Sequence, residues 1–212
     1  MPKARFITLE GGEGTGKSTQ IKLLSEWLNA LGHTVVTTRE PGGSPGAEQI
    51  RKLLVEGDTA RWDGITESLL HFAARRDHLV KTVLPALEKG HWVVCDRFAD
   101  STYAYQGVGH GIDKTILDSL YEAAVGTFQP DLTLVLDLPV EEGLKRAGAR
   151  GEGEDRYERM GVSFHESLRQ AFLAIAAENP DRCEVVDASG SIDEIHQAIR
   201  QTVAKRLDFK GQ

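Results

Sequence analysis

The stretch EGGEGTGKST, residues 10–19, decides the fold of this chain. It holds four glycines, each of which would destabilise the interior of a helix or strand, so something must approach the backbone closely. Residues 11–18 match the pattern G-x-x-x-x-G-K-[ST], whose backbone N–H groups point inward and surround phosphate groups. The sequence therefore predicts a loop that binds the phosphates of a nucleoside triphosphate.

The side chains of this loop supply further chemistry. Lys17 is expected to reach the β- and γ-phosphates and Ser18 to bind Mg²⁺, so ATP and Mg²⁺ are the expected cofactors. A mobile glycine-rich turn is the alternative, but the apolar run before the loop and the helical pattern after it favour a phosphate loop. The expected ATP-binding residues of the loop are Gly11, Gly12, Glu13, Gly14, Thr15, Gly16, Lys17, Ser18 and Thr19.

Apolar runs and helical patterns alternate along the chain. Helical spacing of apolar residues occurs in the segments 21–31, 69–87, 164–175 and 192–203. The runs are nearly continuous in Val, Ile and Leu, which is typical of strands buried on both faces of a parallel sheet. We therefore expect an α/β fold with a five-stranded parallel sheet, helices on both of its faces, and one domain over residues 1–212. The expected strands are Arg5–Glu10, Thr34–Thr38, Trp92–Asp96, Leu132–Leu138 and Arg182–Asp187.

Composition limits the function classes. The net charge of −7 over 212 residues disfavours binding to a nucleic-acid polymer or to an anionic membrane surface. Cys95 and Cys183 each lie in an apolar run and are expected to be buried thiols rather than a disulfide. No stretch has the apolar length of a signal peptide or a membrane span, so the cytoplasm is the expected location.

A second charged pair follows the third apolar run, in WVVCDRF at residues 92–98. Asp96 is expected to hold Mg²⁺ through water, which makes Ser18 and Asp96 the expected metal site. Arg97 lies where ligands bind in open α/β sheets and suits a second phosphate, although a surface ion pair would also explain it.

Three further segments, together with the loop, resemble the thymidylate kinase family of P-loop nucleoside monophosphate kinases. They are TREPGGSPGAEQIR (38–51), DRFADSTYAYQG (96–107) and LKRAGARGEGEDRYE (144–158), and the similarity runs from Phe6 to about Ile199. The resemblance implies a P-loop NTPase fold and the Mg²⁺-dependent reaction ATP + dTMP ⇌ ADP + dTDP, without a covalent intermediate. It also implies a homodimer, with the apolar faces of residues 116–124 and 69–87 as the candidate interface.

The same resemblance assigns roles in an acceptor pocket. Phe72 would stack on thymine, and Arg75 or Arg76 would donate to a carbonyl of the base, a choice that the sequence leaves open. Tyr105 would lie under the deoxyribose, and Glu13 would accept the 3′-hydroxyl. The implied dTMP-binding residues are Glu13, Arg39, Arg51, Phe72, Arg75, Arg76, Arg97, Ser101, Thr102, Tyr105 and Gln106.

Some of these residues have simpler explanations. Arg39, Arg51 and Arg97 are implied partners of the 5′-phosphate, because two like-charged phosphates must be brought together. Arg39 and Arg51 could equally be solvated surface charges, and Phe72 a core residue.

One departure from the family pattern concerns catalysis. Some members carry an arginine just after the acidic residue of the phosphate loop, where this chain has Gly14. A cation from the glycine-rich, charged segment at about 147–158, which is expected to be a mobile lid, would then replace it. Arg146 is assigned to ATP binding, and Arg150 or Arg156 is expected to swing over the transferring phosphoryl group. The implied catalytic residues are Glu13, Lys17, Arg97, Arg150 and Arg156.

Three other function classes remain as alternatives. A kinase for deoxynucleosides or for another monophosphate would share the phosphate loop. A P-loop switch or assembly ATPase is disfavoured because residues 96–107 look like a small-molecule pocket. A nucleic-acid-binding protein is disfavoured by the acidic net charge.

Overall fold

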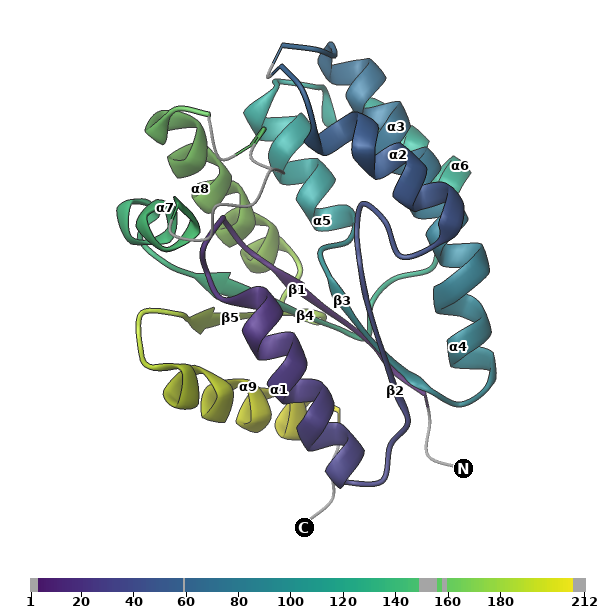
Figure 1. The fold of residues 1–212 in the computed structure, drawn as a ribbon, viewed down its shortest axis with the longest axis vertical. Helices are drawn as coiled ribbons and strands as arrows, with labels where there is room; N and C mark the ends of the chain where they lie inside the picture. Colours follow the sequence, from purple (N-terminus) through teal and green to yellow (C-terminus); the bar gives the residue numbers. More distant parts are fainter. Residues whose placement is uncertain (1–3, 59, 149–155, 158–159, 208–212) are drawn as a thin grey trace.

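The computed structural model describes residues 4–58, 60–148, 156–157 and 160–207, and Figure 1 shows their arrangement. At its centre is a parallel sheet with the strand order β2-β3-β1-β4-β5. The five predicted strands are confirmed, and each boundary lies within one residue of its prediction. The strands are β1 (Phe6–Glu10), β2 (Val35–Arg39), β3 (Trp92–Asp96), β4 (Leu132–Asp137) and β5 (Cys183–Asp187).

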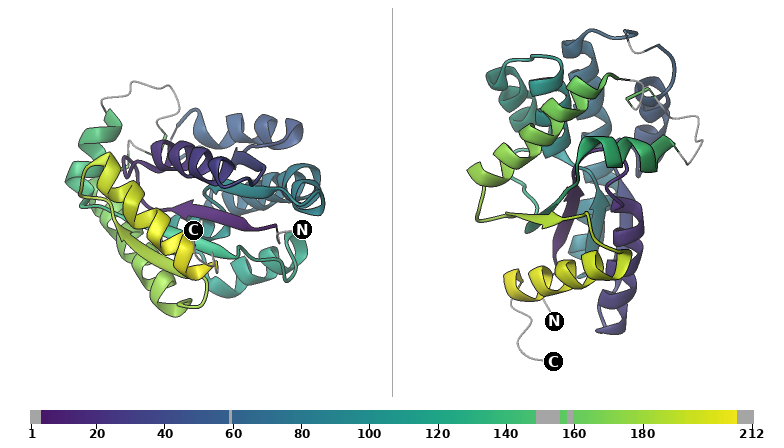
Figure 2. Two further views of the ribbon diagram at one scale, coloured as in Figure 1. Left: turned by 90° about the horizontal axis from the view of Figure 1, so that it is seen from below. Right: turned by 90° about the vertical axis from the view of Figure 1, so that its left-hand side faces the viewer.

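One face of the sheet is covered by α1 (Lys17–Ala30) and α9 (Ile192–Arg206), which lie side by side (Figures 1 and 2). Leu24 of α1 packs with Ile7 and Leu134 of the sheet in a fully buried cluster. Each such side chain contributes about 2 kcal/mol through burial. The apolar stripes predicted for residues 21–31 and 192–203 are therefore the inner faces of these two helices.

The other face is covered by α8 (Val162–Glu178), α5 (Ala99–Thr102) and α6 (Lys114–Ala124), together with a long helix (Figures 1 and 2). Phe6 of β1 and Val135 of β4 belong to the buried clusters on this side. Helices thus cover both faces, as the continuous apolar runs of the strands predict.

The long helix predicted around residues 69–87 is present but not uniform. It consists of α3 (Gly64–His78), a π-helical segment η1 (Leu79–Val83) and α4 (Leu84–Glu88). Pro85 lacks an N–H group and its ring would clash with a regular preceding turn, so the wider π turn accommodates it. A second π-helical segment, η2 (Tyr103–Gly109), carries two residues of the predicted acceptor pocket.

Two more helices border the carboxyl edge of the sheet. They are α2 (Pro45–Val55) and α7 (Val140–Gly148). The last residues of α7 are the start of the predicted lid. Acidic residues in the first turn of α7 and basic residues in its last turn, such as Glu141 and Arg146, favour the helix dipole. Of the predicted lid, the described residues are Ala147, Gly148, Arg156 and Tyr157.

The parallel strands end at one edge of the sheet, and this edge collects the predicted site. The phosphate loop follows β1, Arg39 ends β2 and Asp96 ends β3. Cys95 and Cys183 are free and buried, as predicted. Within the described part of the chain, the helices are too short or too polar to cross a membrane.

Candidate active site

The phosphate loop runs from Gly11 to Gly16, between β1 and α1. Three of its glycines have positive φ angles: 129° at Gly11, 71° at Gly14 and 89° at Gly16. A side chain would strain the backbone at these positions, which explains the glycines. Gly16 is the N-cap of α1, so the unpaired N–H groups and the positive end of that helix face the loop.

The loop also packs directly on the backbone of α7. A Cβ atom built on Gly14 would lie 1.9 Å from the carbonyl oxygen of Gly143, and one built on Gly143 would lie 2.5 Å from the carbonyl oxygen of Glu13. A side chain at position 14 is therefore excluded by contact as well as by φ. The place where some members of the resembled family carry an arginine is occupied by α7 in this protein.

Lys17 is a buried cation held by neutral acceptors. Its Nζ donates to the carbonyl oxygens of Gly11 (3.1 Å) and Gly12 (2.7 Å). Burial and the nearby Arg97 lower the pKa of Lys17 to about 8, against the opposing effect of neighbouring carboxylates. Lys17 is thus mostly protonated at pH 7 and can exchange these carbonyls for phosphate oxygens.

Glu13 is the acceptor at the centre of a charged cluster. Its Oε1 lies 2.8 Å from Nη2 of Arg97 and accepts a hydrogen bond of 2.6 Å from the hydroxyl of Tyr105. Burial would raise the pKa of Glu13, but Arg97 and Lys17 outweigh it and lower the pKa to about 2. Glu13 is therefore ionised at neutral pH and able to accept a hydroxyl proton in a hydrogen bond.

Arg97 has an unusual backbone conformation. Its φ of 66° is the one positive value at a non-glycine residue among those described, and it costs about 1–2 kcal/mol. Its N–H donates to the carbonyl oxygen of Leu9 (3.0 Å), and its Nη1 donates to Gly11 (2.9 Å) and to Ser101 Oγ (3.2 Å). Strain of this kind concentrates at functional sites, and here it directs a guanidinium from the end of β3 toward the phosphate loop.

Glu10 holds the turn that carries Arg97. Its carboxyl group accepts from the N–H of Phe98 (2.7 Å) and from the hydroxyl of Ser101 (2.6 Å). Burial and the neighbouring Asp100 raise the pKa of Glu10 to about 7. Unlike Glu13, Glu10 is therefore only partly ionised near neutral pH and opposes bound phosphates less.

Ser18 and Asp96, the expected metal site, lie together. Ser18 Oγ is 3.4 Å from Asp96 Oδ2, and Asp96 Oδ1 is buried without a hydrogen-bond partner among the described residues. A carboxylate that lies beside a hydroxyl and has its other oxygen unpaired fits Mg²⁺, which P-loop sites hold with few protein oxygens plus water and phosphates. The described residues contain no cluster of three His, Cys, Asp or Glu that would bind a metal without such help.

A cavity of about 200 Å³, which we call the acceptor cleft, opens beside the loop. Two arginines from its rim are also paired, Arg39 with Glu48 (3.0 Å) and Arg51 with the carbonyl oxygen of Pro41 (2.7 Å). The predicted site residues that line the cleft are Glu13, Gly14, Thr15, Gly16, Lys17, Ser18, Arg39, Arg51, Arg75, Asp96, Arg97, Ser101, Thr102, Tyr105 and Gln106.

The two arginines of α3 that the sequence left undecided lie in different places. Arg75 is only 2% exposed; its Nε donates to Glu40 (2.8 Å) and its Nη2 to Thr102 (3.1 Å). Its Nη1 is buried without a partner among the described residues. Arg76 is exposed and donates to the carbonyl oxygen of Ala124 on α6 (3.2 Å). Only Arg75 of the two lines the acceptor cleft.

Also absent from the lining of this cleft are Gly11, Gly12, Thr19, Phe72, Arg146 and Arg156. The ring of Phe72 is buried 4.8 Å beneath the guanidinium of Arg75, so its stacking on a base stays a prediction. Thr19 is exposed on the first turn of α1. Arg146 donates to the carbonyl oxygen of Ala188, in the loop after β5 (3.3 Å).

Arg156, predicted as a mobile catalytic cation, is fully buried instead. Its Nη2 lies 2.5 Å from Glu67 Oε2, and it donates to the carbonyl oxygens of Leu54 (2.9 Å) and Asp58 (3.0 Å). Because a buried guanidinium needs such partners, this conformation holds Arg156 in the interior, and its movement over the phosphates stays a prediction. Arg150 lies outside the described residues.

Sequence reasoning missed a polar stripe on α3. Glu67, His71 and Arg75 follow one another at intervals of four, so they share one face of the helix. His71 and Arg75 line the cleft, and Glu67 lies beneath it. That spacing is a signal that could have found His71 and Glu67, whereas nothing local distinguishes Glu40 or Tyr157, which also line the cleft.

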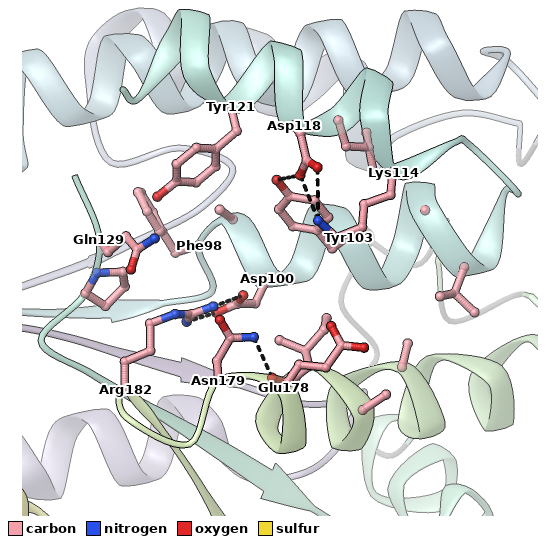
Figure 3. Close-up of a pocket in the computed structure, with 18 of the residues that line it drawn as sticks. Phe98, Asp100, Tyr103, Lys114, Asp118, Tyr121, Gln129, Glu178, Asn179 and Arg182 are labelled. Atoms are coloured by element: carbon pink, nitrogen blue, oxygen red, sulfur yellow. Dashed lines mark hydrogen bonds and ion pairs between the residues drawn. The ribbon is translucent and has the colours of Figure 1, made fainter. Parts of the chain in front are cut away.

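A larger cavity, of about 560 Å³, lies between α6 and α8 (Figure 3). The hydroxyl groups of Tyr103 and Tyr121 border it, and Arg182 pairs with both carboxylate oxygens of Asp100 on its wall (2.7 and 2.8 Å). None of the predicted site residues lines this cavity. The phosphate loop and the unpaired polar atoms, rather than size, identify the smaller cleft as the candidate site.

Comparisons with known proteins agree with this geometry. Residues 9–199 match the family model described as thymidylate kinase. The thymidylate kinase of Caulobacter vibrioides is 54% identical over 98% of this chain and 99% of that protein, and that of Afipia carboxidovorans is 51% identical over 97% and 91%. The crystal structure of thymidylate kinase from Ehrlichia chaffeensis superposes with a TM-score of 0.79 at 35% identity, covering 95% of this chain and all of that one.

Proposed function

Because this chain belongs to the thymidylate kinase family and phosphorylates dTMP to dTDP with ATP, we propose how its residues divide that work. The observation that carries the proposal is the acceptor cleft. It joins a phosphate loop to a buried pocket whose unpaired polar atoms suit thymine. We assign these roles within one domain spanning residues 1–212.

We propose that ATP binds with its phosphates in the loop. Backbone N–H groups and the start of α1 surround the β-phosphate, and Lys17 exchanges its carbonyl partners for the β- and γ-phosphates. Ser18 and, through water, Asp96 would hold Mg²⁺, which neutralises charge on the phosphates when bound. We place the base of ATP beside the loop after β5, where Arg146 donates to the carbonyl oxygen of Ala188.

The base of dTMP is read by two atoms that lack partners in the described structure. Arg75 Nη1 is a donor and Gln106 Oε1 is an acceptor. The amide nitrogen of Gln106 is already used, because it donates to Glu67 (2.8 Å). Thymine offers the complement, the O4 acceptor beside the N3–H donor, whereas cytosine offers an amino group and an unprotonated N3. Matching both atoms at once therefore selects thymine, with Phe72 and Thr102 in supporting positions.

The sugar and the 5′-phosphate lie between the base and the loop in this proposal. The ring of Tyr105 lies under the deoxyribose and Glu13 accepts its 3′-hydroxyl. Arg97 neutralises the 5′-phosphate, with Arg39 and Arg51 at the rim of the cleft. Catalysis is then positioning and charge neutralisation, because loose phosphoryl transfer asks little else of the protein. Of the two lid candidates for the cation over the transferring group, we favour Arg150, because Arg156 is buried against Glu67.

A panel of acceptors tests this assignment. With ATP and Mg²⁺, we expect rapid ADP formation with dTMP, weak activity with dCMP and none with thymidine, which has no phosphate for Arg97. Chelation of Mg²⁺ should remove the activity with dTMP. A coupled assay of the purified protein measures each rate. Comparable rates with dTMP and dCMP would contradict base reading by Arg75 and Gln106.

We also propose a cytoplasmic homodimer, as the family resemblance implies. Exposed apolar side chains lie on the neighbouring helices α3 and α6 and on η1, among them Leu69, Val80 and Ile116. Covering them would remove apolar surface from water. We expect light scattering to give twice the 23.3 kDa of one chain. A mass of one chain at micromolar concentration would reject the dimer.

A further inference from the structure

Glu67 of α3 is a fully buried carboxylate that joins two other segments of the chain, η2 and residues 156–157. Its Oε1 accepts hydrogen bonds from the amide of Gln106 on η2 (2.8 Å) and from the hydroxyl of Tyr157 (2.9 Å). Its Oε2 faces the guanidinium of Arg156 at 2.5 Å. A buried carboxylate needs such compensation, and here each of its two oxygens has a distinct set of partners.

These contacts fix the direction of each hydrogen bond. The hydroxyl of Tyr157 donates to Glu67, so its oxygen is left to accept from Nε2 of His71, 3.1 Å away. Burial and then Arg75 lower the pKa of His71 to about 3, which keeps this ring neutral and compatible with that role. The carboxylate has no proton to donate, so it alone sets the direction of all the hydrogen bonds in this series.

The orientation of Gln106 follows from the same argument. An amide has a donating end and an accepting end, and a carboxylate can bond only the donating end. Gln106 must therefore turn its NH₂ group to Glu67 and its carbonyl oxygen away from it. That oxygen is buried and has no partner among the described residues, and Gln106 lines the acceptor cleft.

We propose that Glu67 is a positioning residue for base selection: it holds the Gln106 amide so that its carbonyl oxygen, and not its NH₂ group, faces N3 of the pyrimidine. Glu67 does not touch the substrate. The proposal rests on the proposed role of Gln106. It adds the reason why Gln106 accepts a hydrogen bond from the N3–H group of the base. The same carboxylate binds Arg156 and Tyr157, so these two residues of the predicted lid are anchored on the base-reading group.

The substitution Glu67→Gln tests the proposal with little change of shape. Arg156 will attract the carbonyl oxygen of the new amide, which turns its NH₂ group toward Gln106. Gln106 must then accept from it and present its own NH₂ group to the base, where it opposes thymine N3–H and suits cytosine N3. We expect the Kd for dTMP to rise about tenfold and the Ki of dCMP to stay level or fall. The KM for ATP should not change.

Two further variants act as controls on this result. Tyr157→Phe removes one donor from Glu67 but keeps the carboxylate, so the ratio of the dTMP Kd to the dCMP Ki should stay within about twofold of wild type. Glu67→Gln combined with Arg156→Met removes both charges of the buried pair. It covers the case in which the single variant fails to fold. Without Arg156 nothing fixes the direction of the new amide, so Gln106 presents its carbonyl oxygen to the base only part of the time, and the ratio should rise by less than in Glu67→Gln alone.

Calorimetry gives the Kd for dTMP, and competition in the kinase assay gives the Ki of dCMP. An unchanged ratio in the folded Glu67 variants, or equal weakening of both nucleotides, would reduce Glu67 to a structural role and overturn the proposal. Gln106→Leu separates this from the underlying assignment. If that variant leaves the Kd for dTMP unchanged, Gln106 does not read the base; if it weakens dTMP while Glu67→Gln does not, only the role of Glu67 is wrong.

Discussion

Replacing Gly14 with alanine is expected to abolish phosphoryl transfer and to lower the free energy of unfolding by about 3 kcal/mol or more. The new Cβ atom would lie 1.9 Å from the carbonyl oxygen of Gly143, a backbone atom of α7 that cannot rotate away. The φ of 71° adds strain for any residue with a side chain. The loop would have to leave α7, and the phosphate-binding N–H groups would move with it.

Gly16→Ala is the matched control for this prediction. Gly16 has a φ of 89°, but a Cβ atom there meets nothing within 4 Å, so the variant carries backbone strain without the contact. Chemical denaturation of both variants, with kcat measured in the coupled assay, separates the two causes. Equal free energies of unfolding for Gly14→Ala and Gly16→Ala would show that the packing of the loop on α7 contributes nothing. An arginine at position 14 should lower kcat and the free energy of unfolding at least as much as alanine does.

Replacing Arg97 with methionine is expected to lower kcat/KM by on the order of 10³-fold. The guanidinium pairs with Glu13 at 2.8 Å and is aimed at the phosphate loop by a strained backbone. Its loss would remove both the charge that we propose faces the 5′-phosphate and the partner of the half-buried Glu13 carboxylate. Since Arg97 is the largest influence that lowers the pKa of Glu13, that pKa should rise from about 2 in the variant.

Steady-state kinetics with dTMP and a pH titration of Glu13 followed by NMR check this prediction. Arg97→Lys keeps the charge but not the planar fork, so it should recover only part of the rate. Arg206→Met, at the far end of α9, controls for the loss of one arginine and should leave kcat/KM unchanged. If Arg97→Met keeps nearly full activity, the transition-state charge is neutralised from elsewhere, and the lid becomes the stronger candidate.

The local features of this protein could be read from its sequence. The glycines of residues 11–16 encode a backbone conformation that depends on φ angles within the loop itself, and Lys17 and Ser18 follow at fixed distances. The strands were found to within a residue because burial on both faces demands continuous apolar runs. Because parallel strands end at one edge, the meeting of Asp96 and the loop could also be foreseen.

The tertiary structure decided the features that depend on a distant partner. Arg75 and Arg76 are neighbours of equal chemistry, and only the packing of α3 between the cleft and α6 gives them different surroundings. In the sequence Arg156 is one more charge in a polar segment, yet in the structure it is buried and paired with Glu67. The reason is physical: φ preferences and hydrophobic period act over a few residues, whereas burial and charge pairing depend on which segments the strand order brings into contact.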